Sequence, residues 1–256
     1  MYKGFNVKNF NFKQKYTMSL NYEIRHLKEN KSIQQTFITP IESYLTKGMN
    51  FDGESIRKGW FPSETKFDVF ISHSRHDKSL AYALAWWLEK YFGLSCFIDS
   101  LVWSHYESLK EKLDKFYTNK YRFAYNETFR NRIYQNIDLM LNTSLMEIMD
   151  KCECLFFLNT PNSIHPGEMH RYLTDSPWLF SEISIFNHIK KTEPSRHPSK
   201  AVAFCESCES SKILNPVDLS KLATLNYKDL NRWMLLKEFN TKEKHSLDIL
   251  YEHMNR

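Results

Sequence analysis

The chain of 256 residues has only six glycines, an odd number of cysteines and no long apolar run. It contains neither G-x-G-x-x-G nor G-x-x-x-x-G-K-[ST], so the glycine-rich phosphate cradles of those two motifs are excluded. H-E-x-x-H and G-x-S-x-G are also absent. No window of about 18 apolar residues occurs, and the first residues have no apolar core of the signal-peptide kind. We therefore expect a cytoplasmic protein with no membrane-spanning helix.

The five cysteines are Cys96, Cys152, Cys154, Cys205 and Cys208. An odd count in a cytosolic chain indicates reduced thiols. Four of these cysteines could be imagined as zinc ligands, but the pairs in CEC and CESC lack flanking glycine turns and match known ligand spacings poorly. We expect Cys96 and Cys154 to pack as small apolar residues in strands, and we predict no metal and no cofactor.

The balance of charges is mildly basic, with a formal net charge of +5. Positive and negative residues are mixed along the chain, and no run of five or six like charges stands out. The sequence therefore has no basic patch that would indicate nucleic-acid binding, whereas an anionic small ligand is compatible with the net charge. The hydrophobic fraction of 42% and the aromatic fraction of 15% predict a folded chain.

A strand–helix–strand unit is the first clear pattern. FDVFIS, residues 67–72, is a short apolar run typical of a buried strand. Asp77 is a candidate N-cap for the helix that follows, and Gly93 is a candidate C-cap. LSCFID, residues 94–99, is the next predicted strand. Short joins predict a parallel pair with a right-handed crossover.

The alternation continues downstream. TSLMEIMDK, residues 143–151, predicts a helix that starts with a capping box formed by Ser144 and Glu147. Ser176 and Pro177 mark the start of another helix in SPWLFSEISIFNHIKK. The remaining elements are predicted strands at 153–160, 201–205 and 223–227 and a last helix at 242–254. This order predicts a doubly wound α/β sheet.

Ligands bind such sheets beyond the carboxyl ends of the strands. Here these ends are Ser72–Asp77, Asp99–Trp103 and Asn159–Ser176. The polar turn after the first predicted strand is therefore expected to lie at a site. Ser72 and His73 are the candidates for ligand contact, whereas the rest of that turn is expected to build the turn and cap the helix.

Glu182 is the carboxylate that stands out. It lies four residues after Trp178, so both side chains share one helix face, and it falls within an apolar stripe rather than on a charged side. One interpretation is a surface glutamate beside a half-buried tryptophan. The other is a desolvated carboxylate beside an aromatic platform, which suits a ribosyl cation and its oxocarbenium-like transition state.

Four segments in order, FDVFISHSRHDK, CFIDS, ECLFFLNT and SPWLFSEI, resemble the Toll/interleukin-1 receptor (TIR) domain in its bacterial form. The resemblance covers about residues 66–255. SPWLFSEI is similar to the family's S-x-W-x-x-x-E helix. The resemblance implies a flavodoxin-like doubly wound parallel sheet of about five strands with helices on both faces.

Many bacterial and plant members of this family cleave NAD+ at the nicotinamide–ribose bond, and some cyclise the product into a signalling nucleotide. The resemblance implies that Glu182 is the functional carboxylate and Trp178 its aromatic partner. It also implies substrate contacts from Ser72, His73 and the loop region that begins at Asp99, including Trp103. The implied partners are NAD+ as the substrate, other copies of the chain through TIR contacts, and a separate effector protein that senses the product in anti-phage immunity.

Two segments depart from the compact family pattern. Residues 1–65 are predicted to be an N-terminal extension of a domain at 66–256, and Met18 is an alternative start. Residues 102–141 are predicted to be an inserted helical segment, with a capping box at Ser104 and Glu107. This segment is either a helical hairpin packed on the core edge or a lid or assembly surface, and it weakens the transfer of Asp99 and Trp103.

Two functions remain open from the sequence. The chain is either a TIR-type NAD+ nucleosidase or cyclase, or a non-catalytic scaffold that acts through TIR–TIR contacts. Glu182 and Trp178 discriminate between them, because a scaffold needs no buried carboxylate beside a tryptophan. The catalytic hypothesis therefore predicts that Glu182 opens into a concave pocket bounded by residues 72–77. A Glu182 side chain that points into bulk solvent on a convex face would contradict it.

Overall fold

A computed structural model describes residues 1–29, 39–47, 50–61, 65–120, 126–166, 172–197, 215–239 and 244–255, without the side chains of 26–29 and 101–104. The chain divides into two compact units. Unit 1 comprises Met1–Glu23, Phe67–Ile98 and Met149–Arg256. Unit 2 comprises Ile24–Lys66 and Asp99–Ile148.

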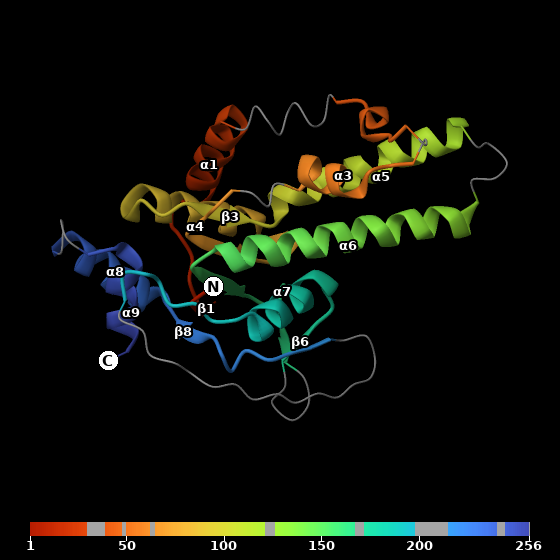
Figure 1. Ribbon diagram of the computed structural model, residues 1–256. Helices are drawn as coiled ribbons and strands as arrows, with labels where there is room; N and C mark the ends of the chain where they lie inside the picture. Colours follow the sequence, from red (N-terminus) through yellow and green to blue (C-terminus); the bar gives the residue numbers. More distant parts are fainter. Residues whose placement is uncertain are drawn as a thin grey trace. The chain divides into compact units, whose positions relative to one another are not determined.

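A five-stranded, all-parallel sheet forms the centre of unit 1 (Figure 1). The strand order is β3-β2-β4-β1-β8. The strands are β1 (Lys3–Lys8), β2 (Val69–Ser72), β3 (Cys96–Ile98), β4 (Cys154–Asn159) and β8 (Ala223–Leu225). The predicted fold class, an α/β doubly wound parallel sheet flanked by helices, is confirmed.

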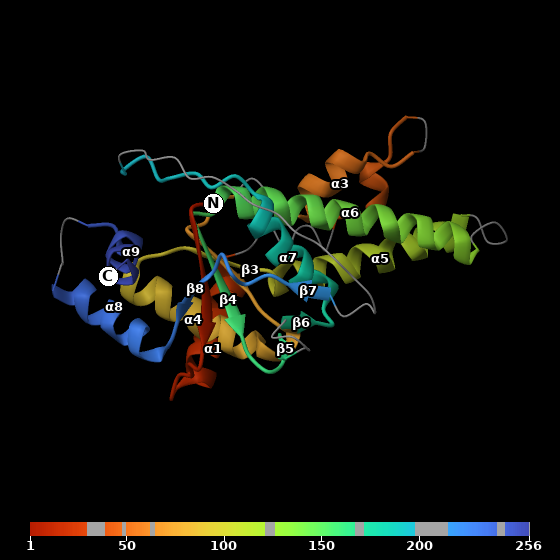
Figure 2. The same ribbon diagram turned by 90° about the horizontal axis from the view of Figure 1, so that it is seen from below.

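Helices cover both faces of this sheet. The helices of unit 1 are α1 (Lys15–Glu29, which runs on into unit 2), α4 (Lys78–Phe92), α7 (Pro177–His188), α8 (Tyr227–Phe239) and α9 (Ser246–Met254) (Figure 2). On one face, Trp233 of α8 stacks on Phe92 of α4 with ring centroids 3.9 Å apart, and Tyr251 of α9 packs on Phe5 of β1. On the other face, α7 approaches β1 so closely that a Cβ on Gly4 would lie 2.4 Å from the Phe186 ring.

The local signals at helix ends were partly right. Gly93 ends α4 in the left-handed conformation with φ 66°, as predicted. The Ser176 hydroxyl accepts a hydrogen bond from the Leu179 amide, and Pro177 occupies the first turn of α7, also as predicted. Asp77 holds the N-cap position of α4, but its side chain makes no capping bond. The Asp77 carboxylate instead accepts hydrogen bonds from Thr160 and Asn162, in the loop after β4.

Strand β1 lies inside a segment that the sequence presents as an extension. It pairs with β4 along its whole length and with β8 on its other side, so residues 1–23 belong to unit 1. The pattern is hard to detect because only Phe5 and Val7 are apolar in the strand interior, whereas Gly4 and Asn6 face α7. The predicted strand at 201–205 lies outside the described residues, and the position beside β4 is held by β1.

A small antiparallel sheet precedes and follows α7 in the chain. It contains β5 (His165–Pro166), β6 (Tyr172–Thr174) and β7 (Asn215–Val217). Strand β6 leads directly into Ser176 and α7, and α7 packs beside β7. This second sheet was not predicted, since its strands have two or three residues each.

Unit 2 is helical in its described residues. Its elements are η1 (Ile41–Tyr44), α3 (Gly53–Trp60), α5 (Ser100–Lys120) and α6 (Glu127–Lys151), whose last residues reach into unit 1. Helices α5 and α6 lie side by side, joined by hydrogen bonds from Tyr106 to Asp138 and from Tyr134 to Asp114.

Two predicted capping boxes in this region are wrong. Ser144 and Glu147 lie inside the continuous helix α6, where Ser144 is buried and Glu147 forms an ion pair with Arg57. Ser104 lies inside α5, which already begins at Ser100. Both motifs fit a helix start locally, but the long apolar stripes on α5 and α6 extend the helices past them.

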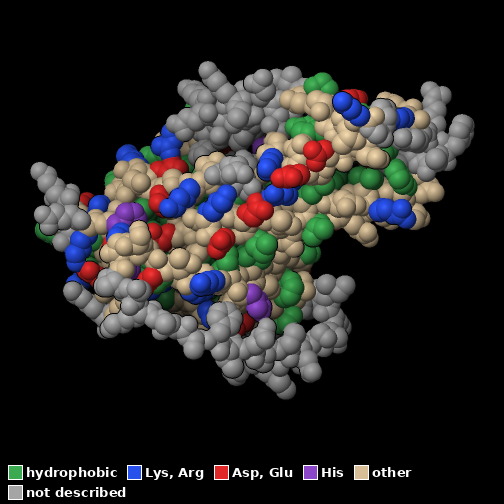
Figure 3. Space-filling model, viewed as in Figure 1, with side chains coloured by type: hydrophobic (Ala, Val, Ile, Leu, Met, Phe, Trp, Pro, Cys, Tyr) green, Lys and Arg blue, Asp and Glu red, His purple; other side chains and the backbone are tan. Residues whose placement is uncertain are grey.

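In the described part of the chain, Cys96, Cys152 and Cys154 are buried and form no disulfide, which confirms the prediction that Cys96 and Cys154 pack inside strands. Cys205 and Cys208 lie outside the described residues. Among the described helices, none has the length and apolarity needed to cross a membrane. On the face shown in Figure 3, Lys and Arg side chains are interspersed with Asp and Glu, in keeping with the mixed charge of the sequence.

Candidate functional site

Glu182 and Ser72 meet at the carboxyl end of the sheet. The Ser72 hydroxyl, on the last residue of β2, donates a hydrogen bond of 2.5 Å to Oε2 of Glu182 on α7. Both side chains are fully buried, at 0% exposure. The carboxylate therefore lies against the first residue of the 72–77 turn and not in bulk solvent. That it opens into a concave pocket stays a prediction.

The sequence places Glu182 there through helix periodicity. Leu179, Ile183 and Phe186 form the buried side of α7, and Glu182 interrupts that apolar side. Gly4 lets Phe186 approach the sheet, and Glu182 lies one helical turn earlier, nearer the carboxyl ends of the strands. A carboxylate in this position is removed from water, so its hydrogen bond to Ser72 matters more than a surface contact would.

His73 and Ser74 continue the turn. The His73 ring is buried, and its Nδ1–H donates to the Ser74 carbonyl oxygen at 2.7 Å. In the neutral imidazole this bond fixes the tautomer and leaves the lone pair on Nε2. The Ser74 hydroxyl accepts a hydrogen bond from the His76 amide, which holds the turn before α4. Arg75 and His76 are exposed, in keeping with the prediction that they only build the turn.

Asp77 ties this turn to the loop after β4. Its Oδ2 accepts a hydrogen bond from the Thr160 hydroxyl at 2.5 Å, and its Oδ1 accepts one from the Asn162 amide at 2.9 Å. The fully buried Ser163 hydroxyl donates to the Leu158 carbonyl oxygen and fixes the same loop from within. Two predicted strand-end segments, 72–77 and the start of 159–176, are therefore held together. The sequence had suggested Asp77 only as a cap.

The other predicted substrate-binding residues have mixed outcomes. Trp178 is half-buried in the first turn of α7, one helical turn before Glu182. Asp99 directly follows β3, is buried and belongs to unit 2. Trp103 lies on α5 of unit 2, and its side chain is outside the described part of the chain. The assignments of these three residues as substrate-binding stay predictions, as do those of Ser72 and His73 and the catalytic role of Glu182.

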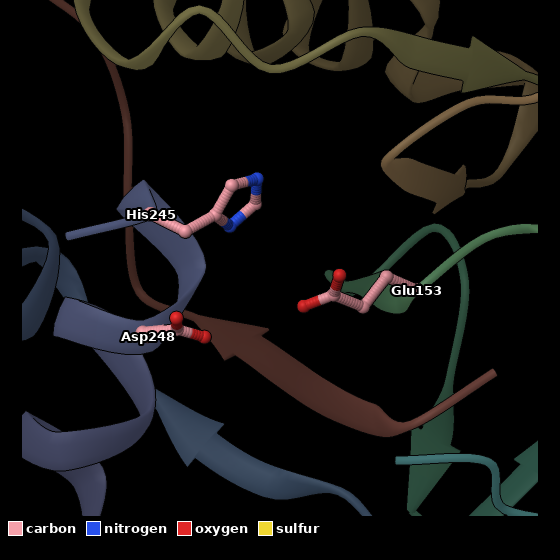
Figure 4. Close-up of side chains that lie close together, drawn as sticks. All are labelled: Glu153, His245 and Asp248. Carbon is pink, nitrogen blue, oxygen red and sulfur yellow. The ribbon is translucent and has the colours of Figure 1, made fainter. Parts of the chain in front are cut away.

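A second cluster of ionisable side chains lies at the opposite, amino end of β4. Glu153, His245 and Asp248 offer ligand atoms within 4.8 Å of one another, and Figure 4 shows Glu153 and His245 pointing toward each other. However, Arg196 donates to both oxygens of Glu153 and both oxygens of Asp248, at 2.5–2.8 Å. The guanidinium already occupies the carboxylate oxygens that a cation would need, so this cluster is an ion-pair network.

This network lowers the pKa of Asp248. Burial alone would raise that pKa, but hydrogen bonds from Arg196 and His197 outweigh it. Tyr251 donates a hydrogen bond to Glu153 at 2.9 Å, and the pKa of Tyr251 is raised by burial and by the charges nearby. The network joins α9 to β4 and serves the fold rather than the Glu182 site.

Comparisons with known proteins identify no relative. No protein-family model matches the chain, and no curated protein or solved structure matches it. The resemblance to the TIR family therefore stays a prediction that depends on the sequence segments and on the site geometry.

Proposed function

We propose that the chain is a TIR-type NAD+ nucleosidase or cyclase that cleaves the nicotinamide–ribose bond. The observation that supports this proposal most is the buried Ser72–Glu182 pair. The family resemblance assigns the catalytic role to Glu182 and substrate contact to Ser72. These two side chains, 110 positions apart in the sequence, bind each other at the carboxyl edge of the sheet, which is where sheets of this kind usually bind ligands.

A purely structural role explains this pair less well. Removing a carboxylate from water carries a large desolvation penalty, and well-packed apolar residues usually stabilise a core at least as well as a buried charge. Leu179, Ile183 and Phe186 show that apolar residues pack readily on the same side of α7. A glutamate retained in that stripe is therefore best explained by chemistry.

The chemistry follows from the charge of the substrate. When the bond between C1′ and the pyridinium nitrogen breaks, its electron pair stays on nitrogen, so nicotinamide leaves as a neutral molecule without an acid catalyst. Positive charge then develops on C1′ and the ring oxygen of the ribose. The Glu182 carboxylate stabilises this charge, and a site shielded from water strengthens the attraction.

The attacking group decides the product. Water adds its oxygen to C1′ and releases a proton, which gives ADP-ribose. A ribose hydroxyl or an adenine nitrogen of the same molecule gives a ring instead. In the first case the chain is a hydrolase; in the second it produces a cyclic signal for a separate effector, as the family resemblance implies for anti-phage immunity.

The test is product analysis with purified full-length protein and NAD+. Nicotinamide, ADP-ribose and cyclic products are separated by chromatography over a range of protein concentrations, because family members depend on self-association. The wild type should release nicotinamide, and Glu182→Gln, which keeps the shape and removes the charge, should lose at least a hundredfold in rate.

Glu252→Gln is the matched control, because Glu252 is an exposed glutamate that pairs with Lys244 on the surface. It should behave as the wild type. Equal nicotinamide release by wild type and Glu182→Gln would contradict the assigned role. No release by the wild type at any protein concentration would favour the non-catalytic scaffold that acts through TIR–TIR contacts.

A further inference from the structure

Strands β1 and β4 each bring an asparagine to the face of the sheet that carries Ser72, Asn6 from β1 and Asn159 from β4. Ser72 and Asn6 are both in register with Phe157 of β4, so the three residues form one row across β2, β4 and β1. Residues in register on neighbouring parallel strands point to the same face. Asn159 lies two residues after Phe157 and therefore points to this face as well, nearer the carboxyl edge.

The packing around β1 confirms which face this is. Phe5 packs on Tyr251 of α9, on the face away from α7. Gly4 approaches Phe186 of α7. Side chains alternate along a strand, so Asn6 shares the α7 face with Gly4. It is two strands away from Ser72, or about 10 Å at the usual strand spacing.

Both asparagines present buried amide atoms that lack a hydrogen-bond partner within the described part of the chain. These atoms are Oδ1 of Asn6 and Nδ2 of Asn159. The Asn6 side chain is buried, with 3% of it exposed. Buried polar groups in native proteins are nearly always paired, and an unpaired one calls for a specific explanation.

We propose that Asn6 and Asn159 extend the Glu182 site and bind the uncharged polar groups of the nicotinamide riboside half of the substrate. This inference rests on the proposed function. A carboxamide offers one acceptor and two donors without charge. It therefore suits ribose hydroxyls and the carboxamide of nicotinamide, and it does not compete with Glu182 for the developing positive charge. On this view the N-terminal strand contributes to substrate binding as well as to the sheet.

The first test separates a binding role from a structural one. Asn6→Leu and Asn159→Leu keep the branched shape and remove the polar atoms. Replacing an unpaired buried amide by an apolar group should leave the unfolding free energy unchanged or raise it. The same variants should raise the KM for NAD+ about tenfold, the size expected for one lost hydrogen bond to the substrate, with a smaller effect on kcat.

Asn187→Leu is the matched control. Asn187 is also a buried asparagine of unit 1 with an unpaired Oδ1, but its Nδ2 donates to the Asp218 carbonyl oxygen beside α7. This variant should lose stability and keep the KM of the wild type. Lost stability together with an unchanged KM in Asn6→Leu and Asn159→Leu would overturn the proposal.

A second test does not depend on turnover. Carba-NAD+, whose carbocyclic ribose resists cleavage, is titrated into ¹⁵N-labelled full-length protein while the side-chain amide resonances are followed. The two resonances that disappear in Asn6→Leu and Asn159→Leu should shift on titration, and that of Asn187 should not. Shifts without NAD+ turnover would retain this binding site and reject the proposed reaction. Turnover without these shifts would retain the reaction and reject the binding site.

Discussion

The hydrogen bond between Ser72 and Glu182 makes a measurable prediction about stability. Ser72→Ala removes the donor and leaves a fully buried carboxylate without it. Hydrogen bonds to charged groups contribute about 1.5–3 kcal/mol, and the complete burial of this pair favours the upper half of that range. Ser72→Ala should therefore lower the unfolding free energy by about 2–3 kcal/mol at neutral pH.

A double-mutant cycle separates the free energy of the Ser72–Glu182 hydrogen bond from the packing that each single substitution removes. Glu182→Leu fills the same space without charge. It removes the desolvation penalty of the carboxylate but also removes the acceptor of the buried Ser72 hydroxyl, so these two effects on stability oppose each other. In that background Ser72→Ala should have almost no effect. The coupling energy from urea unfolding at 25 °C should therefore be about 2 kcal/mol.

Ser163→Ala provides the control for this cycle. Ser163 is equally buried, but its hydroxyl donates to the Leu158 carbonyl oxygen rather than to a carboxylate. Ser163→Ala should lower the unfolding free energy by the same amount whether position 182 is Glu or Leu. A coupling energy below about 0.5 kcal/mol between Ser72 and Glu182 would refute the reasoning, because that value is within the error of independent sites.

Three further predictions concern the scaffold of the site. A chain that starts at Met18 lacks β1 and should show no cooperative unfolding transition by circular dichroism; a native-like transition would contradict the central place of β1. Asp77→Ala removes the acceptor for the Thr160 hydroxyl, so it should lower the unfolding free energy by about 1–2 kcal/mol and speed amide exchange in residues 160–163. Unchanged amide exchange would contradict the role of this hydrogen bond in holding the loop. Asp248 has a pKa below its ordinary 3.8 because hydrogen bonds from Arg196 outweigh burial, so its stabilising effect is complete above about pH 4 and is lost as the pH falls through the lowered value. The stability difference between wild type and Asp248→Asn should therefore shrink in acid, and a constant difference from pH 6 to pH 2 would contradict this.

The sequence predicts the parts of the fold that depend on local signals. Apolar runs identify β2, β3 and β4, and Gly93 and Ser176 mark helix ends where the structure has them. These features depend on residues that are close in the sequence. They are enough to derive the parallel sheet and the edge at which Ser72 and Glu182 meet.

Other features depend on distant partners and give no such signal. β1 looks like a polar arm because Gly4 and Asn6 interrupt its apolar residues. The reason for Gly4 is the close approach of Phe186, a residue far away in the sequence. Asp77 fits an N-cap locally, yet two donors from the loop after β4 compete successfully for its carboxylate. In each case a tertiary contact decides a choice that the local pattern leaves open or decides differently.

The central claim is that Glu182 acts on the nicotinamide–ribose bond. The most direct measurement is the rate of nicotinamide release from NAD+, followed by proton NMR, for wild type, Glu182→Gln and Glu252→Gln at the same protein concentration. The account predicts release by the wild type and by Glu252→Gln, and a rate at least about a hundredfold lower for folded Glu182→Gln. Equal rates for all three proteins would contradict it.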